Sequence, residues 1–232
     1  MKGVCRRRWV LVLLFFLAVP LLGKPIPITG LCDTGFNTVA GVDQCYTVRS
    51  DGSWGSAYVV TSSYPFIGGG GESLWLANSS SSKWIGPRIN YSGGVSDADG
   101  NYYFRTTFVL PNNADLDEAL ISGFWSSDNT GVDILLNGVS TGNQIAFGTY
   151  PNLSFQALHS FSIIGSAGFV TGLNTLDFVV NNPSGYPCCD ATGLRVSGMQ
   201  GTVEEEYIIP EPATLWLLGG GLAGLILLRR RR

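Results

Sequence analysis

Short apolar runs separated by turn-forming clusters are the feature that most restricts how this chain can fold. Between residues 24 and 209, no long segment repeats its apolar residues at the 3.6-residue period of a helix. The runs instead predict strands at 57–61, 73–77, 102–110, 119–126, 132–137, 155–164, 173–181 and 193–201. Glycine, with 31 of the 232 residues, is frequent between them. The pattern predicts one all-β domain, a two-sheet β-sandwich or jelly roll.

Two local patterns refine this prediction. Within 102–110 the side chains alternate, and the aromatic-rich set is expected to face the core: Tyr102, Phe104, Thr106 and Phe108. The dipeptide Asn137-Gly138 follows the apolar run 132–136 and favours a two-residue type I′ hairpin turn, because both turn positions need a positive φ.

The basic residues gather at the two ends of the chain. Of 14 Lys and Arg residues, four lie in the first eight positions and four are the last four, which leaves six basic against sixteen acidic residues at 24–209. An acidic middle argues against nucleic acid as a partner. Each basic end adjoins an apolar stretch, so we expect both ends to be targeting signals outside the fold.

Residues 1–23 are predicted to be a secretory signal peptide. Lys2 and Arg6–Arg8 supply its positive start, and Trp9–Leu22 supplies an apolar helix that is too short for an ordinary bilayer span. Cleavage is expected near Gly23. An uncleaved N-terminal anchor is the alternative.

Residues 208–232 are predicted to be a C-terminal sorting segment. Its apolar part, Ala213–Leu228, would form a single transmembrane helix about 24 Å long, and Arg229–Arg232 would stay in the cytoplasm. The domain at 24–207 is then exported, while the chain is held transiently in the inner membrane.

The order of motifs in this segment resembles the PEP-CTERM sorting signal of Gram-negative bacteria. It has Pro210-Glu211-Pro212, then Ala213-Thr214, a glycine-rich apolar span and the arginine tail. The resemblance implies that an exosortase, an integral-membrane transpeptidase-like enzyme, recognises the tripeptide. The segment would then be cut and the protein passed to the cell surface or extracellular matrix. An ordinary anchor with a stiff Pro-Glu-Pro spacer is the alternative.

About half of the chain, from Trp84 to Val203, also resembles the galactose-binding-like jelly rolls that recur ahead of such signals. The segments that carry this resemblance are 102–108, Asp128-Asn129, 132–138, Gly142, 161–163, Phe169, 172–182 and 192–196. It implies a jelly-roll fold with carbohydrate-binding relatives. Sugar-binding loops vary widely in this fold, so the resemblance supplies no set of contact residues.

Few residues could support catalysis. His159 is the only histidine, and neither a Gly-x-Ser-x-Gly motif nor a Cys/His cluster is present. Asp128 and Asp133 flank a turn and could form a glycosidase pair, but such aspartates more often cap their own turn. We therefore predict a non-enzymatic protein without catalytic residues.

No cofactor or metal site is predicted. The run Asp97-Ala98-Asp99-Gly100-Asn101 is similar to a fragment of a calcium loop, but the distant Glu of an EF-hand is missing. A polar β-turn is the simpler interpretation, and a structural Ca²⁺ held by loop oxygens is the alternative.

Carbohydrate binding would require exposed aromatic rings beside polar groups. The candidate rings are Trp54, Trp75, Trp84, Trp125, Tyr64, Tyr91 and Tyr150. Trp84 is favoured because loop-like sequence surrounds it, whereas Trp75 and Trp125 lie in apolar runs typical of a core. The ligand-binding hypothesis therefore names Trp84, Tyr91, Asp128 and Asn129.

Four cysteines remain after Cys5 leaves with the signal peptide, and an exported domain favours their oxidation. Cys32, Cys45, Cys188 and Cys189 allow three pairings. Because a bond between the adjacent Cys188 and Cys189 is strained, we expect Cys32 and Cys45 to be joined to them. A Cys32–Cys45 bond with a free Cys188-Cys189 pair is the alternative.

These patterns predict a non-enzymatic protein of the cell surface or exopolysaccharide matrix, with weak carbohydrate binding. Its expected partners are an exosortase, the membrane and a polysaccharide. An adhesion or assembly module that contacts proteins is the first alternative. A glycoside-active enzyme that uses Asp128 and Asp133 is the second.

Overall fold

The computed structural model of the protein describes residues 24–67, 71, 73–93, 95–149, 152–165, 168–184, 190–206, 219–222 and 229. The predicted signal peptide, the Pro-Glu-Pro tripeptide, most of the predicted membrane helix, Tyr150 and Cys188-Cys189 lie outside these residues. Within the described ranges, no helix has both the length and the apolar character needed to cross a bilayer.

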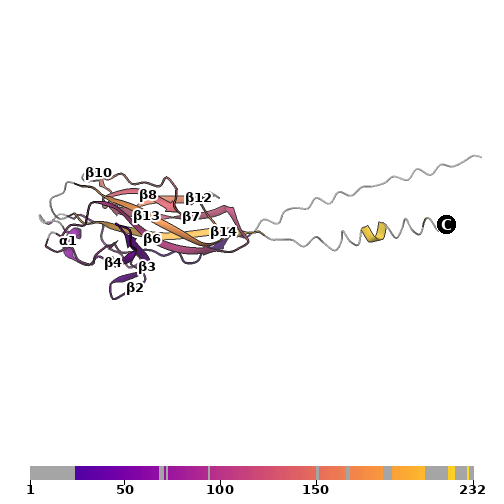
Figure 1. The fold of residues 1–232 in the computed structure, drawn as a ribbon, viewed down its shortest axis with the longest axis horizontal. Helices are drawn as coiled ribbons and strands as arrows, with labels where there is room; N and C mark the ends of the chain where they lie inside the picture. The colour runs from indigo at the N-terminus through magenta and orange to yellow at the C-terminus, as the bar shows by residue number, and fades with distance from the viewer. Residues whose placement is uncertain are drawn as a thin grey trace, which may run out of the picture.

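The described residues form an elongated antiparallel β-sandwich (Figure 1). Its short strands are β1 (Ile26–Pro27), β2 (Thr38–Val39), β5 (Ile85–Gly86), β9 (Val139–Ser140), β10 (Gly148–Thr149) and β11 (Asn152–Leu153). Its longer strands are β3 (Val42–Arg49), β4 (Gly55–Val59), β6 (Gly100–Leu110), β7 (Ala114–Asp128), β8 (Thr130–Leu136), β12 (His159–Ile164), β13 (Gly172–Asn182) and β14 (Gly193–Glu205). One helical turn, α1 (Ser63–Phe66), lies at one end of the body.

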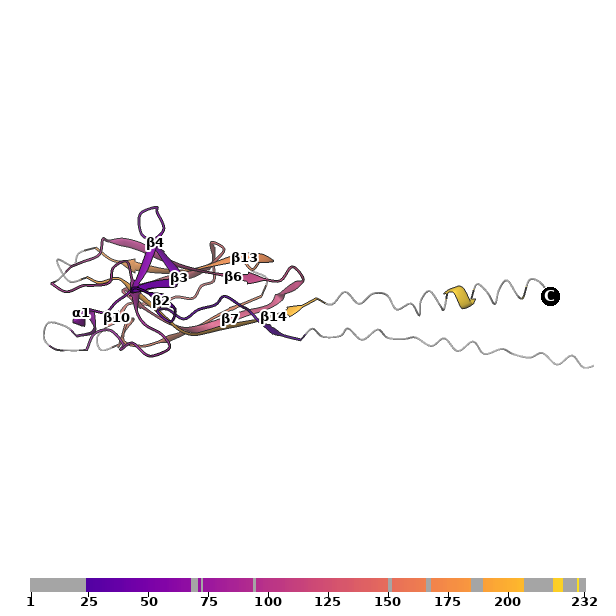
Figure 2. The ribbon, with the colours of Figure 1, turned by 90° about the horizontal axis from the view of Figure 1, so that it is seen from below.

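Ten strands follow one hydrogen-bonded path, β12-β7-β14-β5-β4-β3-β6-β13-β8-β9, while β2 pairs with β3 beside it and β10 and β11 form a separate two-stranded sheet. The short strand β5 joins the two layers, because Ile85 pairs with Leu194 of β14 on one side and with Val59 of β4 on the other. Strand β1 pairs with the last residues of β14, so the body begins and ends at the same pole, opposite α1 (Figures 1 and 2).

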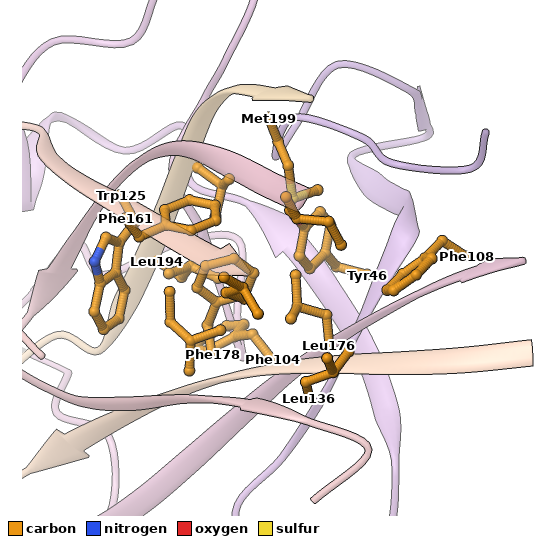
Figure 3. Packing of buried hydrophobic residues seen from close by; sticks show 14 of the residues in the cluster. Tyr46, Phe104, Phe108, Trp125, Leu136, Phe161, Leu176, Phe178, Leu194 and Met199 are labelled. Atoms are coloured by element: carbon orange, nitrogen blue, oxygen red, sulfur yellow. The ribbon is translucent and has the colours of Figure 1, made fainter. Parts of the chain in front are cut away.

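The main core lies between the two layers around Phe178 of β13 (Figure 3). The ring centroid of Phe178 lies 5.7 Å from that of Trp125 in β7, 5.6 Å from Phe161 in β12 and 6.4 Å from Tyr46 in β3. All four side chains are at least 96% buried. Tilted and edge-on rings at these separations are the favoured geometry of aromatic pairs, so both layers contribute to one packed centre.

A second, smaller core fills the pole that carries α1. It consists of Val60, Trp75, Trp84, Tyr91, Phe155 and Ala191. The Trp75 and Trp84 rings stack with centroids 4.3 Å apart. A Cβ at Gly193 would come within 2.4 Å of the Trp75 ring, which explains why β14 begins with a residue that has no side chain.

Most of the predicted strands are confirmed. Strands β6, β7, β8, β13 and β14 contain nearly all of the runs expected at 102–110, 119–126, 132–137, 173–181 and 193–201, and β4 overlaps the run at 57–61. The alternation in β6 is also confirmed, since Tyr102, Phe104, Thr106 and Phe108 are all buried. Asn137 and Gly138 have φ values of 51° and 81° and join β8 to β9, as the hairpin signal predicts.

One predicted strand is wrong, one begins too early and one strand was missed. Residues 73–77 form only an isolated bridge at Ser73, because this segment folds inward to bury Trp75 in the second core. Strand β12 begins at His159, and Phe155 lies in a turn whose ring packs into the same core. Strand β3 is absent from the prediction because the buried carboxylate of Asp43 interrupts its apolar pattern.

The described disulfide joins Cys32 to Cys45, with Cα atoms 6.2 Å apart. The expectation that both are joined to Cys188 and Cys189 is therefore wrong, and the Cys32–Cys45 bond of the alternative is confirmed. Asp43 shapes the enclosed loop, because its carboxylate accepts hydrogen bonds from the backbone N–H groups of Gly35 at 2.6 Å and Cys45 at 2.7 Å. Tyr46 closes the loop by donating its hydroxyl to the Cys32 carbonyl at 2.9 Å.

Replacing both cysteines of this bond should lower the free energy of unfolding. The bond closes a short loop of 13 residues in sequence separation. A chain-entropy account gives a loss of about 3 kcal/mol for a loop of this length. Urea unfolding of the full chain in detergent would measure the loss in the double variant Cys32→Ala/Cys45→Ala. Because this variant already lacks the bond, adding a reductant should not destabilise it further through loss of this bond. A disulfide-linked peptide that joins Cys32 or Cys45 to 188–189 would contradict the pairing.

Candidate functional site

The predicted sugar-stacking rings are buried. Trp84 and Tyr91 are 0% exposed and belong to the second core. The loop assignment of Trp84 is correct, but its predicted exposure is wrong. The ring stacks on Trp75, and its indole N–H donates to the Leu76 carbonyl at 2.8 Å. Trp75 and Trp125 are core residues, as expected, although Trp75 lies outside any strand.

Tyr91 serves the fold through its hydroxyl. It donates to Asp97 Oδ2 at 2.7 Å, with the Thr192 carbonyl oxygen 3.0 Å away. Burial raises the pKa of Tyr91 well above its ordinary value, and the Asp97 charge acts in the same direction. The phenol therefore remains a neutral donor that ties the 88–98 loop to the start of β14.

The Asp97–Asn101 segment leads through a bend at Asp99 into β6, and its first carboxylate is engaged by protein donors. The Asp97 carboxylate accepts from Arg88 Nε at 2.6 Å, from the Tyr91 hydroxyl, and from the Thr192 N–H at 2.8 Å. These donors occupy both of its oxygens. Gly100 follows with a φ of 129° and opens β6. In the part of the chain that the structure describes, no three His, Cys, Asp or Glu side chains are grouped to hold a metal.

Asp128 and Asp133 occupy different hydrogen-bond networks. Asp128 ends β7, where its Oδ2 accepts the Trp75 indole N–H at 2.6 Å. Asp133 lies within β8 and accepts from the Ile134 N–H at 2.8 Å, the Ser140 hydroxyl at 2.5 Å and the Gly142 N–H at 3.1 Å. Asp133 thus stabilises the β8–β9 hairpin that follows it rather than the turn between Asp128 and Asp133. Asp128 has another role, considered below.

The surface that best fits a ligand lies on the outer face of β3, β6 and β13. We call it the arginine–aromatic surface and define it as Arg49, Trp54, Tyr103, Arg105 and Asp177. Strand register builds it: Arg49 of β3 lies opposite Tyr103 of β6, and Arg105 of β6 lies opposite Asp177 of β13. Trp54 reaches the same face from the turn that precedes β4.

The two arginines alternate with the two rings of this surface. Arg49 Cζ lies 4.7 Å from the Tyr103 ring centroid and 4.9 Å from that of Trp54, and Arg105 Cζ lies 4.2 Å from Trp54. Trp54, Arg49, Tyr103 and Arg105 are all partly exposed. A groove of about 590 Å³ adjoins this surface at Trp54 and Arg105, and its lining also includes Thr107 but neither Arg49 nor Tyr103. This face offers ring surface and N–H donors together.

The charges of the two arginines differ in how they are compensated. Arg105 forms a two-point ion pair with Asp177, with Nε–Oδ1 at 2.6 Å and Nη2–Oδ2 at 2.7 Å, and this hydrogen bonding raises the pKa of Arg105. Among the described carboxylates, none forms an ion pair with Arg49. Arg49 therefore presents a fixed positive charge, held between two rings, that can still bind an anion.

Sequence reasoning included Trp54 among the candidate rings but favoured Trp84. It did not find Arg49, Tyr103 or Asp177 as site residues. The available signal was the alternation of residues along each strand. Tyr103 and Arg105 belong to the set of β6 residues that was predicted to face away from the core.

Comparison with known proteins matches residues 209–232 to the PEP-CTERM protein-sorting motif. No curated protein matches the chain. The match covers the tripeptide, the apolar stretch and the arginine tail, so the predicted sorting signal is confirmed. The chain is therefore an exported protein that carries a signal for exosortase sorting, with transient membrane association before surface display.

The buried carboxyl of Asp43 gives the domain a pH dependence of known sign. Burial raises its pKa above 3.8, against the lowering effect of three backbone N–H donors. The folded state therefore binds this proton more tightly than the unfolded state. This contribution to stability is present at low pH and is lost as the pH rises through the native pKa.

Urea unfolding of wild type and of Asp43→Asn at several pH values above about 4 would measure this contribution. The stability of wild type should decline more steeply with rising pH than that of the variant. Asp51→Asn, at an exposed position, is the matched control and should keep the wild-type slope. Parallel slopes for wild type and Asp43→Asn would contradict the raised pKa.

Proposed function

We propose that this protein is a non-enzymatic component of the cell surface or extracellular matrix that binds acidic polysaccharide through the arginine–aromatic surface. The sorting motif at 209–232 supports the destination. The observation that carries the binding proposal is Arg49, which lies between the Trp54 and Tyr103 rings without a carboxylate partner among the described residues.

The surface suits a sugar because it combines apolar ring surface with polar groups. Sugar rings present C–H faces that pack on aromatic side chains, and hydroxyls that need hydrogen-bond partners. Trp54 and Tyr103 supply ring surface, and the groove beside them is lined by Thr47, Ser56 and Thr107. The groove is shallow and lies along the flank of the sandwich, which suits an extended chain better than a small enclosed ligand.

The charge of Arg49 favours an acidic sugar. A guanidinium group matches the two oxygens of a carboxylate or sulfate with two parallel N–H donors. Arg105 is committed to Asp177, so Arg49 would supply the charge contact and Arg105 would hold Trp54 in place. Because the other exposed charges of the domain are mainly acidic, an anion would be drawn to this surface only over a short range.

Binding can be tested with the full chain in detergent and two sets of immobilised polysaccharides, uronate-rich and neutral. We expect retention by the acidic set, weakened by salt. Arg49→Ala should reduce this affinity about tenfold, because a hydrogen bond to a charged group contributes about 1.5 kcal/mol or more. Trp54→Ala should reduce it as well.

Lys24→Ala is the matched control, since it removes one positive charge from an exposed position on another part of the body and should bind like wild type. Equal affinity of wild type and Arg49→Ala would remove the proposed site. Failure to bind either set would favour an adhesion or assembly module. Exposed aliphatic pairs support that second candidate: Val109 lies opposite Leu173, and Leu120 lies opposite Ile164.

Processing by an exosortase makes a separate prediction about the mature protein. The intact mass of the protein recovered from its native cells should lack the arginine tail at 229–232, because the sorting segment is cut away. A variant with Pro210, Glu211 and Pro212 replaced by Ala should retain that tail. A native mass that includes all four arginines would contradict cleavage.

A further inference from the structure

Five polar side chains gather at the pole of the sandwich that carries α1. Asp128 ends β7, Asn129 follows it, Asn182 ends β13, and Asp190 and Thr192 precede β14. Strand register brings them together. Gly193, next to Thr192, lies opposite Asp128, while Asn181 lies opposite Thr130, next to Asn129. All five residues are more than 90% buried.

The network around Asp97 fixes four of these residues relative to one another, whereas Asp128 is held by the Trp75 indole N–H. Asn182 Nδ2 donates to the carbonyl oxygens of Asp97 at 3.3 Å and Ala98 at 3.2 Å. The Asp97 N–H donates to the Asp190 carbonyl at 2.9 Å, and the Thr192 N–H donates to Asp97 Oδ2. The Asn129 amide hydrogen-bonds the Asp190 carboxyl, which opposes the rise in the Asp190 pKa caused by burial.

Four oxygen atoms in this group have no hydrogen-bond partner among the described residues. They are Asp128 Oδ1, Asn129 Oδ1, Asn182 Oδ1 and Thr192 Oγ1. Each carries lone pairs that burial has removed from water, and an unsatisfied buried polar group costs about 1–3 kcal/mol. One such atom can be tolerated. Four of them, brought to one pole by strand pairing, point to a common electropositive partner.

The charges lead to the same conclusion. Asp97 is neutralised by Arg88, whose Nε lies 2.6 Å from its carboxylate. Asp128 and Asp190 form no ion pair with any cationic side chain that the structure describes. This group therefore holds two buried carboxyl groups and three further unsatisfied oxygen atoms, and a divalent cation would balance both charges once the carboxyls are ionised.

We propose that this pole binds a calcium ion through Asp128, Asn129, Asn182, Asp190 and Thr192. These side chains offer carboxylate, amide and hydroxyl oxygen atoms, the donors that Ca²⁺ prefers, and five residues approach the six to eight ligands it takes. Nitrogen and sulfur donors, which zinc favours, are absent from the set. Mg²⁺ is disfavoured because it demands strict octahedral geometry and usually keeps several waters.

The site differs from the calcium loop considered in the sequence. Asp97 belongs to that run, but its oxygens already accept from Arg88, Tyr91 and Thr192. Asp97 instead supports the site, because its backbone positions Asn182 and Asp190. The proposed ligands come from three separate parts of the chain, so the ion would join β7, β13 and β14 at a pole where loops connect them.

Terbium luminescence would test this proposal on the full chain in detergent after treatment with EGTA. Tb³⁺ has ligand preferences like those of Ca²⁺, and Trp75 can transfer excitation to it because the indole N–H lies 2.6 Å from the Asp128 carboxylate. Excitation of tryptophan should give terbium emission that Ca²⁺ displaces more effectively than Mg²⁺. Added Ca²⁺ should also raise the temperature of unfolding.

Asp190→Asn is the informative variant, since its carboxylate can be removed without touching the Trp75 contact. We expect its Ca²⁺ affinity to fall about tenfold or more, as for other losses of ligand charge. Asp99→Asn is the matched control, because it removes the same charge from an exposed neighbouring position. This control should bind Ca²⁺ like wild type.

Two results would overturn the proposal. The first is wild-type protein that gives neither sensitised emission nor a calorimetric Ca²⁺ signal, which decides the question even if the variants fail to fold. The second is equal weakening in Asp190→Asn and Asp99→Asn, which would assign the effect to surface charge. Neither result bears on polysaccharide binding at Arg49, which lies on the flank of the sandwich.

Discussion

The contact of Phe178 with rings from both layers is the interaction on which the rest of this structure depends. Phe178 lies in β13, yet it meets Trp125 and Phe161 from the opposite layer and Tyr46 from its own. This packing holds the two layers together. Within the layer of Phe178, the pairing of β3, β6 and β13 places Arg49 beside Tyr103 and Asp177 beside Arg105 on the outer face. The layer that carries the surface proposed to bind polysaccharide is therefore held against the other layer by this core.

The two proposed sites use polar groups in opposite ways. On the flank, Arg49 and Trp54 remain partly exposed, where a charge costs little and an incoming ligand can reach it. At the α1 pole, Asp128, Asn129 and Thr192 are buried beneath a second core of stacked tryptophans. Groups placed there cannot meet a polysaccharide, but they can stabilise the loops that connect the layers. The first site would serve recognition and the second would serve stability.

The sequence was most informative where local pattern determines structure. The alternation of β6, the Asn137-Gly138 turn and the sorting motif were all predicted correctly. It failed where distant segments decide the outcome. Trp84 lies between a serine run and Gly86-Pro87, so it resembled an exposed loop residue, and residues of the second core from other segments, such as Trp75 and Phe155, bury it. Strand β3 was missed for the same reason. In the sequence, Asp43 is typical of a surface position, whereas in the fold its carboxylate is buried and accepts hydrogen bonds from the N–H groups of Gly35 and Cys45. The choice among three disulfide pairings likewise required knowing which cysteines lie close together.

Strand β1 pairs with the last residues of β14, so the sandwich is entered and left at a single pole. A body attached to a membrane or a surface through that pole would extend away from it along its long axis. Its flanks would stay open to the surrounding matrix in every orientation, and α1 with the loops around Asp128 would form the outermost tip. In that arrangement the tip would be the part of the domain farthest from its attachment. Stabilising it would matter more to the lifetime of the protein than strengthening the pole at which the chain is attached.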